Sequence, residues 1–211
     1  MFYKKEFPMS NRPGRPSKGN ERSSREKIID TAISIIRENG ADALTVRNVC
    51  DTAGLSIGTF YHYFRDKDDL MMYFLKETSF DSFKLKTPLS NISGRISELY
   101  MHLIHKYMDL GLDFMKSFYS TENRSLSAYM GEENGSFAEG SVMAISEKEM
   151  SEALDCGIIK PGSDIHLLCI DICTIVKGCV FEWCLNDGKP DIESSLNRIL
   201  SNYMSNYLVN Q

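Results

Sequence analysis

Between residues 45 and 67, apolar positions fall at the spacing of two short helices joined by a tight turn. The first helix places apolar residues at i, i+3, i+4 and i+7, namely Val46, Val49, Cys50 and Ala53. Thr45 can cap its start, and Gly54 stands where a helix often ends in the left-handed conformation. Leu55 can fill the corner, and Ser56 can cap a second helix from Ile57. This pattern predicts a helix-turn-helix, whose second helix enters the DNA major groove.

The second short helix has one apolar face and one face with the chemistry of a DNA contact. Phe60 and Phe64 lie four residues apart and are predicted to point inward, which leaves four residues outward: Ile57, Gly58, Tyr61 and His62. Gly58 lets the backbone approach a groove, and Tyr61, His62 and Lys67 can reach phosphate oxygens. Ile57 and Thr59 are the candidate readers of base edges, through a thymine methyl group and a hydroxyl bond. The alternative is a plain helical hairpin whose aromatic residues all belong to the core.

Several short motifs in this region resemble the TetR family of transcriptional regulators. They are Leu44-Thr45-Val46, Ala53-Gly54-Leu55-Ser56 and Gly58-Thr59-Phe60-Tyr61-His62-Tyr63-Phe64, followed by Lys67 and Leu70. The resemblance spans roughly residues 24 to 75. It implies an all-helical homodimer of two-domain chains that binds a palindromic operator and is released by a small ligand. It also implies DNA contacts at Thr45, Arg47, Ser56 to Thr59, Tyr61, His62 and Lys67, while Ile57 departs from the residue often found there.

The charge of the chain is unevenly distributed. The 211 residues carry a net charge of −5, yet residues 1–67 hold 12 Lys and Arg against 8 Asp and Glu. The N-terminal part is therefore +4 and the rest is −9. The positive charge thus lies in the part of the chain that contains the predicted helix-turn-helix. The acidic residues after position 67 argue against a protein that binds nucleic acid along its whole surface.

Residues 1–22 are predicted to be a flexible basic arm, because Pro and Gly interrupt any regular structure there. Arg12, Arg15 and Lys18 are its candidate minor-groove contacts. A solvated tail without a DNA role is an equal alternative. We assign residues 23–67 to the DNA-binding domain and 68–211 to a helical ligand-binding and dimerisation domain, giving an all-α chain of about nine helices.

The last two predicted helices, about 164–186 and 191–208, are the candidate dimer interface. The first is apolar on nearly every side, although polar residues interrupt it at His166, Asp171, Lys177 and Glu182, which favours a buried helix over a membrane span. A second copy of the chain is the natural cover for its outer face, and the resemblance implies a four-helix bundle between copies.

The C-terminal domain also holds a candidate effector pocket of aromatic, Met and His side chains. The residues are Tyr100, Leu103, His105, Tyr107, Phe114, Phe118 and Met143. An ordinary place in the core or on the surface is the alternative for each of them. Packing is also the preferred interpretation of Cys169, Cys173 and Cys184, which share one helical face, over a thiol sensor or a metal site between subunits.

No catalytic residue, cofactor or metal site is predicted, because the chain lacks a Gly-rich phosphate loop, H-E-x-x-H, G-x-S-x-G and C-x-x-C. Six cysteines without a secretory signal favour a reducing cytoplasm. The sequence therefore predicts a cytoplasmic, homodimeric, ligand-released repressor. An activator or a ligand-independent regulator stays open, as does a helical small-molecule-binding or enzymatic dimer without a DNA function.

Overall fold

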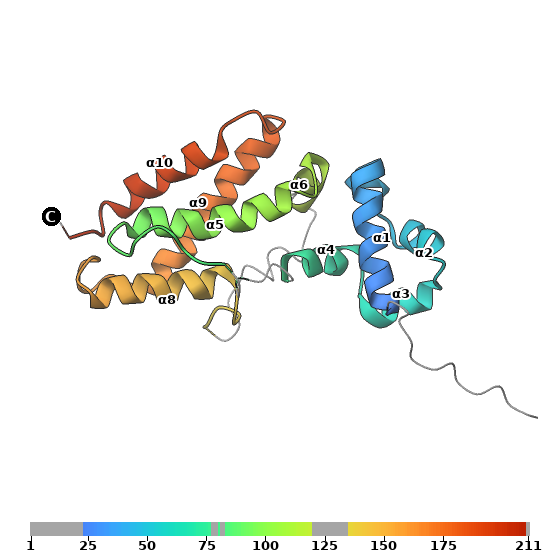
Figure 1. Cartoon of the computed structure of the whole chain (residues 1–211), viewed down its shortest axis with the longest axis horizontal. Helices are drawn as coiled ribbons and strands as arrows, with labels where there is room; N and C mark the ends of the chain where they lie inside the picture. Colours follow the sequence, from blue (N-terminus) through green and yellow to red (C-terminus); the bar gives the residue numbers. More distant parts are fainter. Residues whose placement is uncertain (1–22, 77–79, 81–82, 120–134, 210–211) are drawn as a thin grey trace, which may run out of the picture.

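The computed structural model describes residues 23–76, 80, 83–119 and 135–209, and in these ranges it contains helices, turns and isolated bridges but no β-strand. The predicted all-α class is confirmed. The elements are α1 (Ser24–Asn39), η1 (Ala41–Ala43), α2 (Val46–Ala53), α3 (Ile57–Tyr63), α4 (Lys67–Lys76), α5 (Ile92–Met108), α6 (Leu112–Phe118), α8 (Val142–Asp155), α9 (Ile165–Leu185) and α10 (Ile192–Met204). Residues 23–66 form a small head, residues 83–119 and 135–209 form a larger body, and α4 lies between them (Figure 1).

The head is a three-helix unit in which α1 packs against both α2 and α3. Its start is fixed by a capping box, because the Ser23 hydroxyl accepts the Glu26 N–H at 3.2 Å and the Glu26 carboxylate accepts the Ser23 N–H at 2.8 Å. The core is formed by one apolar residue or more from each helix: Ile28, Ala32, Ile36, Val49 and Phe60. These contacts hold α3 on the outside of the head with one side uncovered.

The body is organised around α5, which packs against α6, α8 and α10, while α9 packs against α6, α8 and α10. Tyr100 on α5 and Ile172 on α9 are fully buried, and Leu200 of α10 closes the same core. The largest apolar side chains of the body thus point inward from several helices at once, and burying them is the main stabilising contribution to the fold.

One predicted boundary differs from the structure. The last helix ends at Met204 and not near residue 208, because the chain turns there and Leu208 forms an isolated bridge with Ile159. The α4 helix spans Lys67–Lys76, and Phe83 lies outside any helix in the segment that precedes α5, with its N–H donating to the Phe80 carbonyl at 2.9 Å. Within the described ranges, no helix is both long and apolar enough to cross a membrane.

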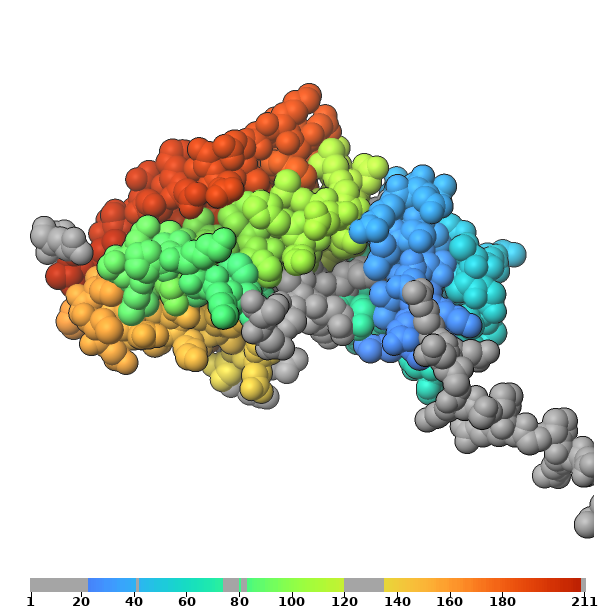
Figure 2. Space-filling view, in the orientation of Figure 1, coloured from blue at the N-terminus to red at the C-terminus, as the bar shows by residue number. Residues whose placement is uncertain are grey.

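The head touches the body through α6 as well as through α4. The α6 helix packs against η1, and a Cβ atom added to Gly40 would lie 3.4 Å from the Asp113 carboxylate. Gly40 has φ +81°, a conformation that L side chains rarely adopt, so the chain turns from α1 into η1 directly beside α6. Figure 2 shows the blue head meeting the body next to the yellow-green segment that contains α6.

Candidate nucleic-acid interface

The angle between α2 and α3 is set by a left-handed residue. Gly54 has φ +66° and ψ +36°, and the Leu55 N–H donates to the Cys50 carbonyl at 2.9 Å. The Cys50 thiol points toward the Ser56 carbonyl at 3.7 Å, which ties the end of the turn back to α2. The two helices are therefore joined by the short Gly-containing turn that the sequence predicted.

Each short helix begins with a hydroxyl cap that faces solvent. The Thr45 oxygen accepts the Asn48 N–H at 3.1 Å, and the Ser56 oxygen accepts the Thr59 N–H at 3.0 Å. Because a hydroxyl that accepts an amide N–H still carries its own proton, an exposed cap is able to donate to a phosphate oxygen. Thr45 and Ser56 are both exposed, so they are placed for this contact.

The inner side of α3 is anchored by aromatic contacts. Phe60 is fully buried, and its ring centre lies 5.7 Å from that of Phe64, which is also buried. Phe64 meets the edge of Tyr73 on α4 at 5.9 Å, and the Arg25 guanidinium of α1 lies 4.4 Å from the centre of the Tyr73 ring. The predicted inward orientation of Phe60 and Phe64 is confirmed, and these rings fix α3 relative to α1 and α4.

The outer side of α3 is the recognition surface, formed by Ile57, Gly58, Tyr61 and His62, and all four residues are exposed. Ile57 and Tyr61 expose 50% and 56% of their surface, which is unusual for side chains of that size. The predicted outward orientation of this face is confirmed. Its predicted contacts with bases and phosphates stay predictions.

Two predicted contact residues are less accessible than their sequence positions suggested. Thr59 is half-buried, and its hydroxyl lies 2.8 Å from that of Ser56, so part of its hydrogen-bonding capacity is used within the helix. Lys67 is half-buried at the first position of α4. Arg47 is exposed, with its guanidinium 3.8 Å from the Asp51 carboxylate, a surface pair that is weak enough to exchange for a phosphate.

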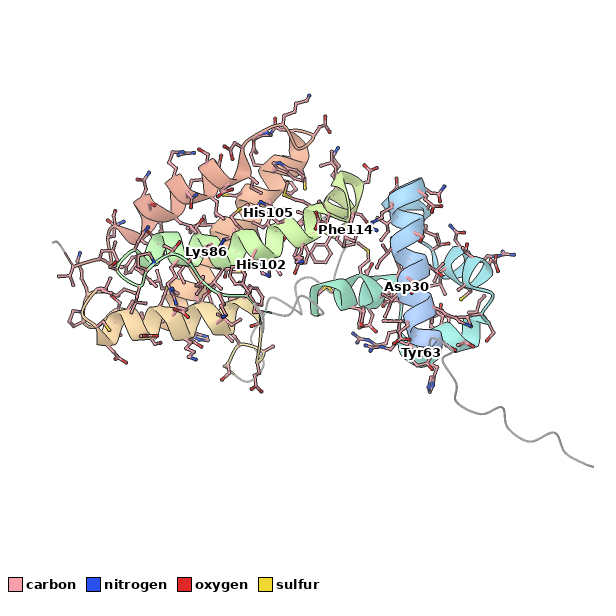
Figure 3. The ribbon with its side chains drawn as sticks, in the orientation of Figure 1. Asp30, Tyr63, Lys86, His102, His105 and Phe114 are labelled. Carbon is pink, nitrogen blue, oxygen red and sulfur yellow. The ribbon has the colours of Figure 1, made fainter. Side chains whose placement is uncertain are left out.

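Sequence reasoning missed Tyr63, which exposes 38% of its surface at the end of α3 (Figure 3). Its ring packs edge-on against His62 with the centres 4.8 Å apart. Helical phase alone would have placed Tyr63 near the boundary between the inner and outer faces. The minor-groove candidates Arg12, Arg15 and Lys18 lie outside the described residues.

Six of the seven predicted effector-contact residues are buried in the body. This ligand cluster consists of Tyr100, Leu103, Tyr107, Phe114, Phe118 and Met143, all of which are buried. The rings of Phe114 and Phe118 are stacked with centres 5.7 Å apart, and Tyr107 lies 6.0 Å from Phe118. His105 does not join them, because it is exposed and lines a different part of the surface of α5. Figure 3 labels His105 on α5 and Phe114 on α6.

Burial controls the ionisation of the groups around the ligand cluster. Burial, followed by the nearby Cys173 and Cys169, raises the pKa of Tyr100 well above its usual value. Its hydroxyl is inaccessible to solvent, and the Ser146 hydroxyl and the Cys173 thiol are polar groups that act on it. Burial, with Glu147 and Cys173 adding to it, raises the pKa of Cys169 to about 12. The Tyr100 phenol is therefore a neutral donor held inside an apolar cluster.

The cysteines show no arrangement for metal binding. All six are free thiols, and Cys169, Cys173 and Cys184 are buried within the body. Among the residues that the structure describes, no group of three His, Cys, Asp or Glu side chains is placed to hold a metal ion.

A capped helix-turn-helix with an exposed second helix, carried on an all-helical body, defines a DNA-binding transcriptional regulator. Residues 28–73 match the model of the bacterial regulatory proteins of the tetR family. The match covers the head and most of α4, so this part of the chain is similar to the DNA-binding region of the TetR-family transcriptional regulators.

Proteins with related sequences or folds include regulators of fatty acid metabolism. The chain is 26% identical over 176 residues to the fatty acid metabolism regulator protein of Bacillus subtilis, covering 82% of this chain and 90% of that protein. The solved structure of FadR from Bacillus subtilis in complex with stearoyl-CoA has a TM-score of 0.52 and 21% identity, covering 83% of this chain and 95% of that one. FadR of Thermus thermophilus in complex with lauroyl-CoA has a TM-score of 0.59 and 16% identity, with coverage of 89% and 96%. These structural similarities establish the fold.

Proposed function

We propose that this protein is a homodimeric repressor that binds a palindromic operator and releases it when an acyl-chain effector enters the body. The observation that carries this proposal is the recognition surface, where a glycine and three exposed side chains face outward from a helix anchored by buried aromatic rings. A surface of that kind has no role in packing the chain. It suits a groove whose walls are phosphates and whose floor is formed by base edges.

The exposed stripe of α9 supports a dimer. At alternating steps of four and three residues it presents the α9 seam: Leu167, the half-buried Asp171, which accepts the Tyr203 O–H of α10, then Thr174, Gly178, Phe181 and Leu185. Leu167, Phe181 and Leu185 expose 52%, 47% and 62% of their surface, while Gly178 has nothing within 4 Å of an added Cβ. Apolar ends with small residues in the middle are the pattern of two helices that cross closely. A second α9, flanked by α10, is the partner that covers this seam.

Two copies of the chain are also required because the α3 helix is short. The α3 helix has seven residues and reaches only a few base pairs. A two-fold dimer presents two such helices to half-sites about one helical turn, roughly 34 Å, apart. The dimer therefore accounts both for the uncovered seam and for sequence-specific binding.

The ligand cluster supports an effector with a long apolar chain and one polar group. Its walls are apolar rings and Met143, and the Tyr100 hydroxyl offers a buried hydrogen-bond donor. Two related regulators were solved with stearoyl-CoA and lauroyl-CoA, which combine an acyl chain with a polar thioester. Such a ligand would separate α5 from α6 on entry. It releases DNA only if it binds the released geometry more tightly than the operator-bound one.

Fluorescence anisotropy with DNA from the promoter of the protein's own gene tests the DNA function. We expect saturable binding that weakens steeply as salt rises, together with a preference for a palindromic segment over scrambled DNA of equal length. No binding at low salt would instead favour a ligand-binding or enzymatic helical dimer.

Titration of the DNA complex with stearoyl-CoA, and separately with coenzyme A alone, tests the effector. We expect release by the acyl thioester only. Tyr100→Phe keeps the ring and removes the donor, so it should raise the half-release concentration by about three- to tenfold, as for loss of one neutral hydrogen bond. Equal release by coenzyme A would rule out an effector recognised by its chain. The affinity of Tyr100→Phe for the operator, measured without effector, should equal that of the wild type. This measurement is the control that the variant is folded.

A further inference from the structure

A second concave site lies on the body, separate from the ligand cluster. It is a groove of about 560 Å³ between α5, α10 and the segment that precedes α5. Along α5 it is lined by Ser97, Glu98, His102 and His105, and along α10 by Glu193, Asn197 and Ser201. Figure 3 shows His102 and His105 on α5, and Lys86 on the neighbouring segment that forms one wall. We call this site the α5–α10 groove.

The wall formed by residues 83–87 is fixed to α5 by charged groups. Each oxygen of the Glu98 carboxylate accepts one backbone N–H, from Lys86 at 2.9 Å and from Thr87 at 2.8 Å. The Arg95 guanidinium donates to the Thr87 carbonyl at 2.6 Å and forms a 2.6 Å ion pair with Glu149. The groove is therefore present before any ligand arrives, which lowers the entropy lost on binding.

The aromatic part of this wall is ordered by stacking. The rings of Phe83 and His102 lie parallel, with centres 4.0 Å apart and planes 19° apart. Partial burial, and then the charges of Lys106 and His105, lower the pKa of His102. The His102 imidazole is therefore neutral at pH 7 and keeps a nitrogen lone pair that accepts an N–H.

The remaining polar groups of the groove are mainly acceptors. Glu193 and Asn197 are exposed, and neither makes a hydrogen bond or ion pair within the described part of the chain. The lining contains two carboxylates and no Lys or Arg, and the sequence after residue 67 carries a net charge of −9. Lys86 and Lys106 are nearby but do not line the groove. Such a surface attracts cations and is poorly suited to phosphates or acyl carboxylates.

Ser97 adds an unsatisfied group to the groove lining. It is 2% exposed, and its hydroxyl has no hydrogen-bond partner among the described residues. A buried polar group without a partner destabilises the folded state, so native proteins rarely keep one without a reason. A ligand amine or a water that it orders would satisfy this hydroxyl.

We propose that the α5–α10 groove binds a linear polyamine, a small organic cation with several N–H donors separated by methylene groups. Glu193, Asn197 and Ser201 follow one another at four-residue steps and span about 12 Å along α10, a length suited to successive amines. Glu193 takes one ammonium group, while Asn197, His102 and His105 accept N–H groups. The methylene segments lie against Phe83 and Met101. This site goes beyond the proposed function, because it lies on a different face of α5 from the ligand cluster and takes a ligand of opposite charge.

Isothermal titration calorimetry of the full-length protein with spermidine tests the proposal. We expect saturable binding of one spermidine per chain at moderate salt and no heat of binding with 1,8-octanediol, which has a similar length without charge. Glu193→Gln should weaken binding about fivefold. Glu152→Gln removes the same charge from an exposed position on α8 and should leave the affinity unchanged.

A steric variant provides an independent measurement. Ser201 is exposed on α10, so Ser201→Phe fills the groove without disturbing the core and should abolish spermidine binding while operator affinity is kept. Equal weakening by Glu193→Gln and Glu152→Gln would show diffuse attraction to an acidic surface and overturn the proposal. So would undiminished binding in Ser201→Phe, or no binding to the wild-type protein. Loss of operator or acyl-CoA binding in separate assays would concern the proposed function alone.

Discussion

At the scale of single residues, the recognition surface depends on which positions of α3 lack a large inward contact. Gly58 lies between Ile57 and the half-buried Thr59, and an added Cβ would be 3.7 Å from the Ser56 hydroxyl, an ordinary contact. The glycine is therefore not needed for folding. We propose that its lack of a side chain lets the DNA duplex approach the backbone of α3.

Gly58→Ala separates folding from DNA binding. Alanine favours a helix interior over glycine by up to about 1 kcal/mol, so thermal unfolding should occur at an equal or higher temperature. Operator affinity measured by anisotropy should fall about tenfold, because the methyl group occupies the space of the backbone contact. An unchanged affinity would place the duplex on another surface of the head.

Buried and exposed thiols should differ sharply in reactivity. Burial first, then Glu147 and Cys173, raises the pKa of Cys169 to about 12, so at pH 8 almost none of this thiol is the reactive thiolate. Cys156 is exposed at the end of α8. Iodoacetamide followed by mass spectrometry should label Cys156 first and Cys169 only after denaturation. Rapid labelling of Cys169 in the folded protein would contradict the buried arrangement of α9.

Helical phase explains which residue assignments were predictable. Tyr100, Leu103 and Tyr107 follow the i, i+3, i+7 pattern of one face of α5, and they are buried together. His105 is two residues beyond Leu103, about 200° around the helix, and it is exposed in the α5–α10 groove. The prediction grouped His105 with the aromatic residues of α5 because they are close in sequence. It did not take account of the angle between them around the helix axis. The burial of Phe60 and the exposure of Tyr61 followed from the same rule applied correctly.

At the scale of elements, local signals located helix starts better than helix ends or connecting segments. Thr45 and Ser56 accept the predicted capping N–H groups at 3.1 and 3.0 Å, because a cap depends on residues only a few positions away. The extended segment before α5 is held by Glu98, which lies 11 and 12 residues from the amides that it accepts. A contact between residues so far apart in the sequence produces no periodic pattern of apolar positions, so the sequence did not predict it.

Replacing Glu98 tests how this segment is held. Partial burial acts to raise the pKa of Glu98, but the N–H groups of Lys86 and Thr87 outweigh it and lower the pKa. A carboxylate with a depressed pKa stabilises the fold above its unfolded pKa, and this stability is lost as pH falls through the folded pKa. Glu98→Gln should lower the unfolding free energy by about 1 kcal/mol at pH 7.

The pH dependence of this variant provides the control. Urea unfolding should show the difference between wild type and Glu98→Gln shrinking as pH falls below the usual range of a Glu carboxyl. A difference that stays constant down to pH 3 would mean that the side chain stabilises the segment by packing and not by its charge.

At the scale of the whole molecule, the α9 seam was only partly visible in the sequence. The sequence showed a helix apolar on nearly every side, and the structure distinguishes its buried face from the exposed stripe that includes Leu167, Gly178 and Phe181. Which face is left uncovered depends on how α8 and α10 pack, so periodicity alone did not determine it. Because the residues of the seam are known, the predicted pairing of subunits through α9 can be tested by substitution.

Phe181→Lys should dissociate the dimer. It places a charge in the apolar seam, where it would lose water on association without gaining a partner. Sedimentation velocity should show a shift toward monomer at micromolar concentration, and operator affinity should fall with it. Val209→Lys, at an exposed apolar position near the C-terminus, is the matched control and should remain dimeric. An intact dimer in Phe181→Lys would exclude α9 as the interface.

The contact between α6 and η1 gives the molecule a mechanical property that a simple tether would lack. Head and body are joined twice, once along the chain through α4 and once where Asp113 borders Gly40. Such a double attachment closes a loop of rigid parts. The head therefore cannot rotate freely about α4. Any large reorientation must first break the contact between α6 and η1. The protein should therefore switch between two discrete geometries, with this contact formed or broken, and not pass through a continuous range of angles.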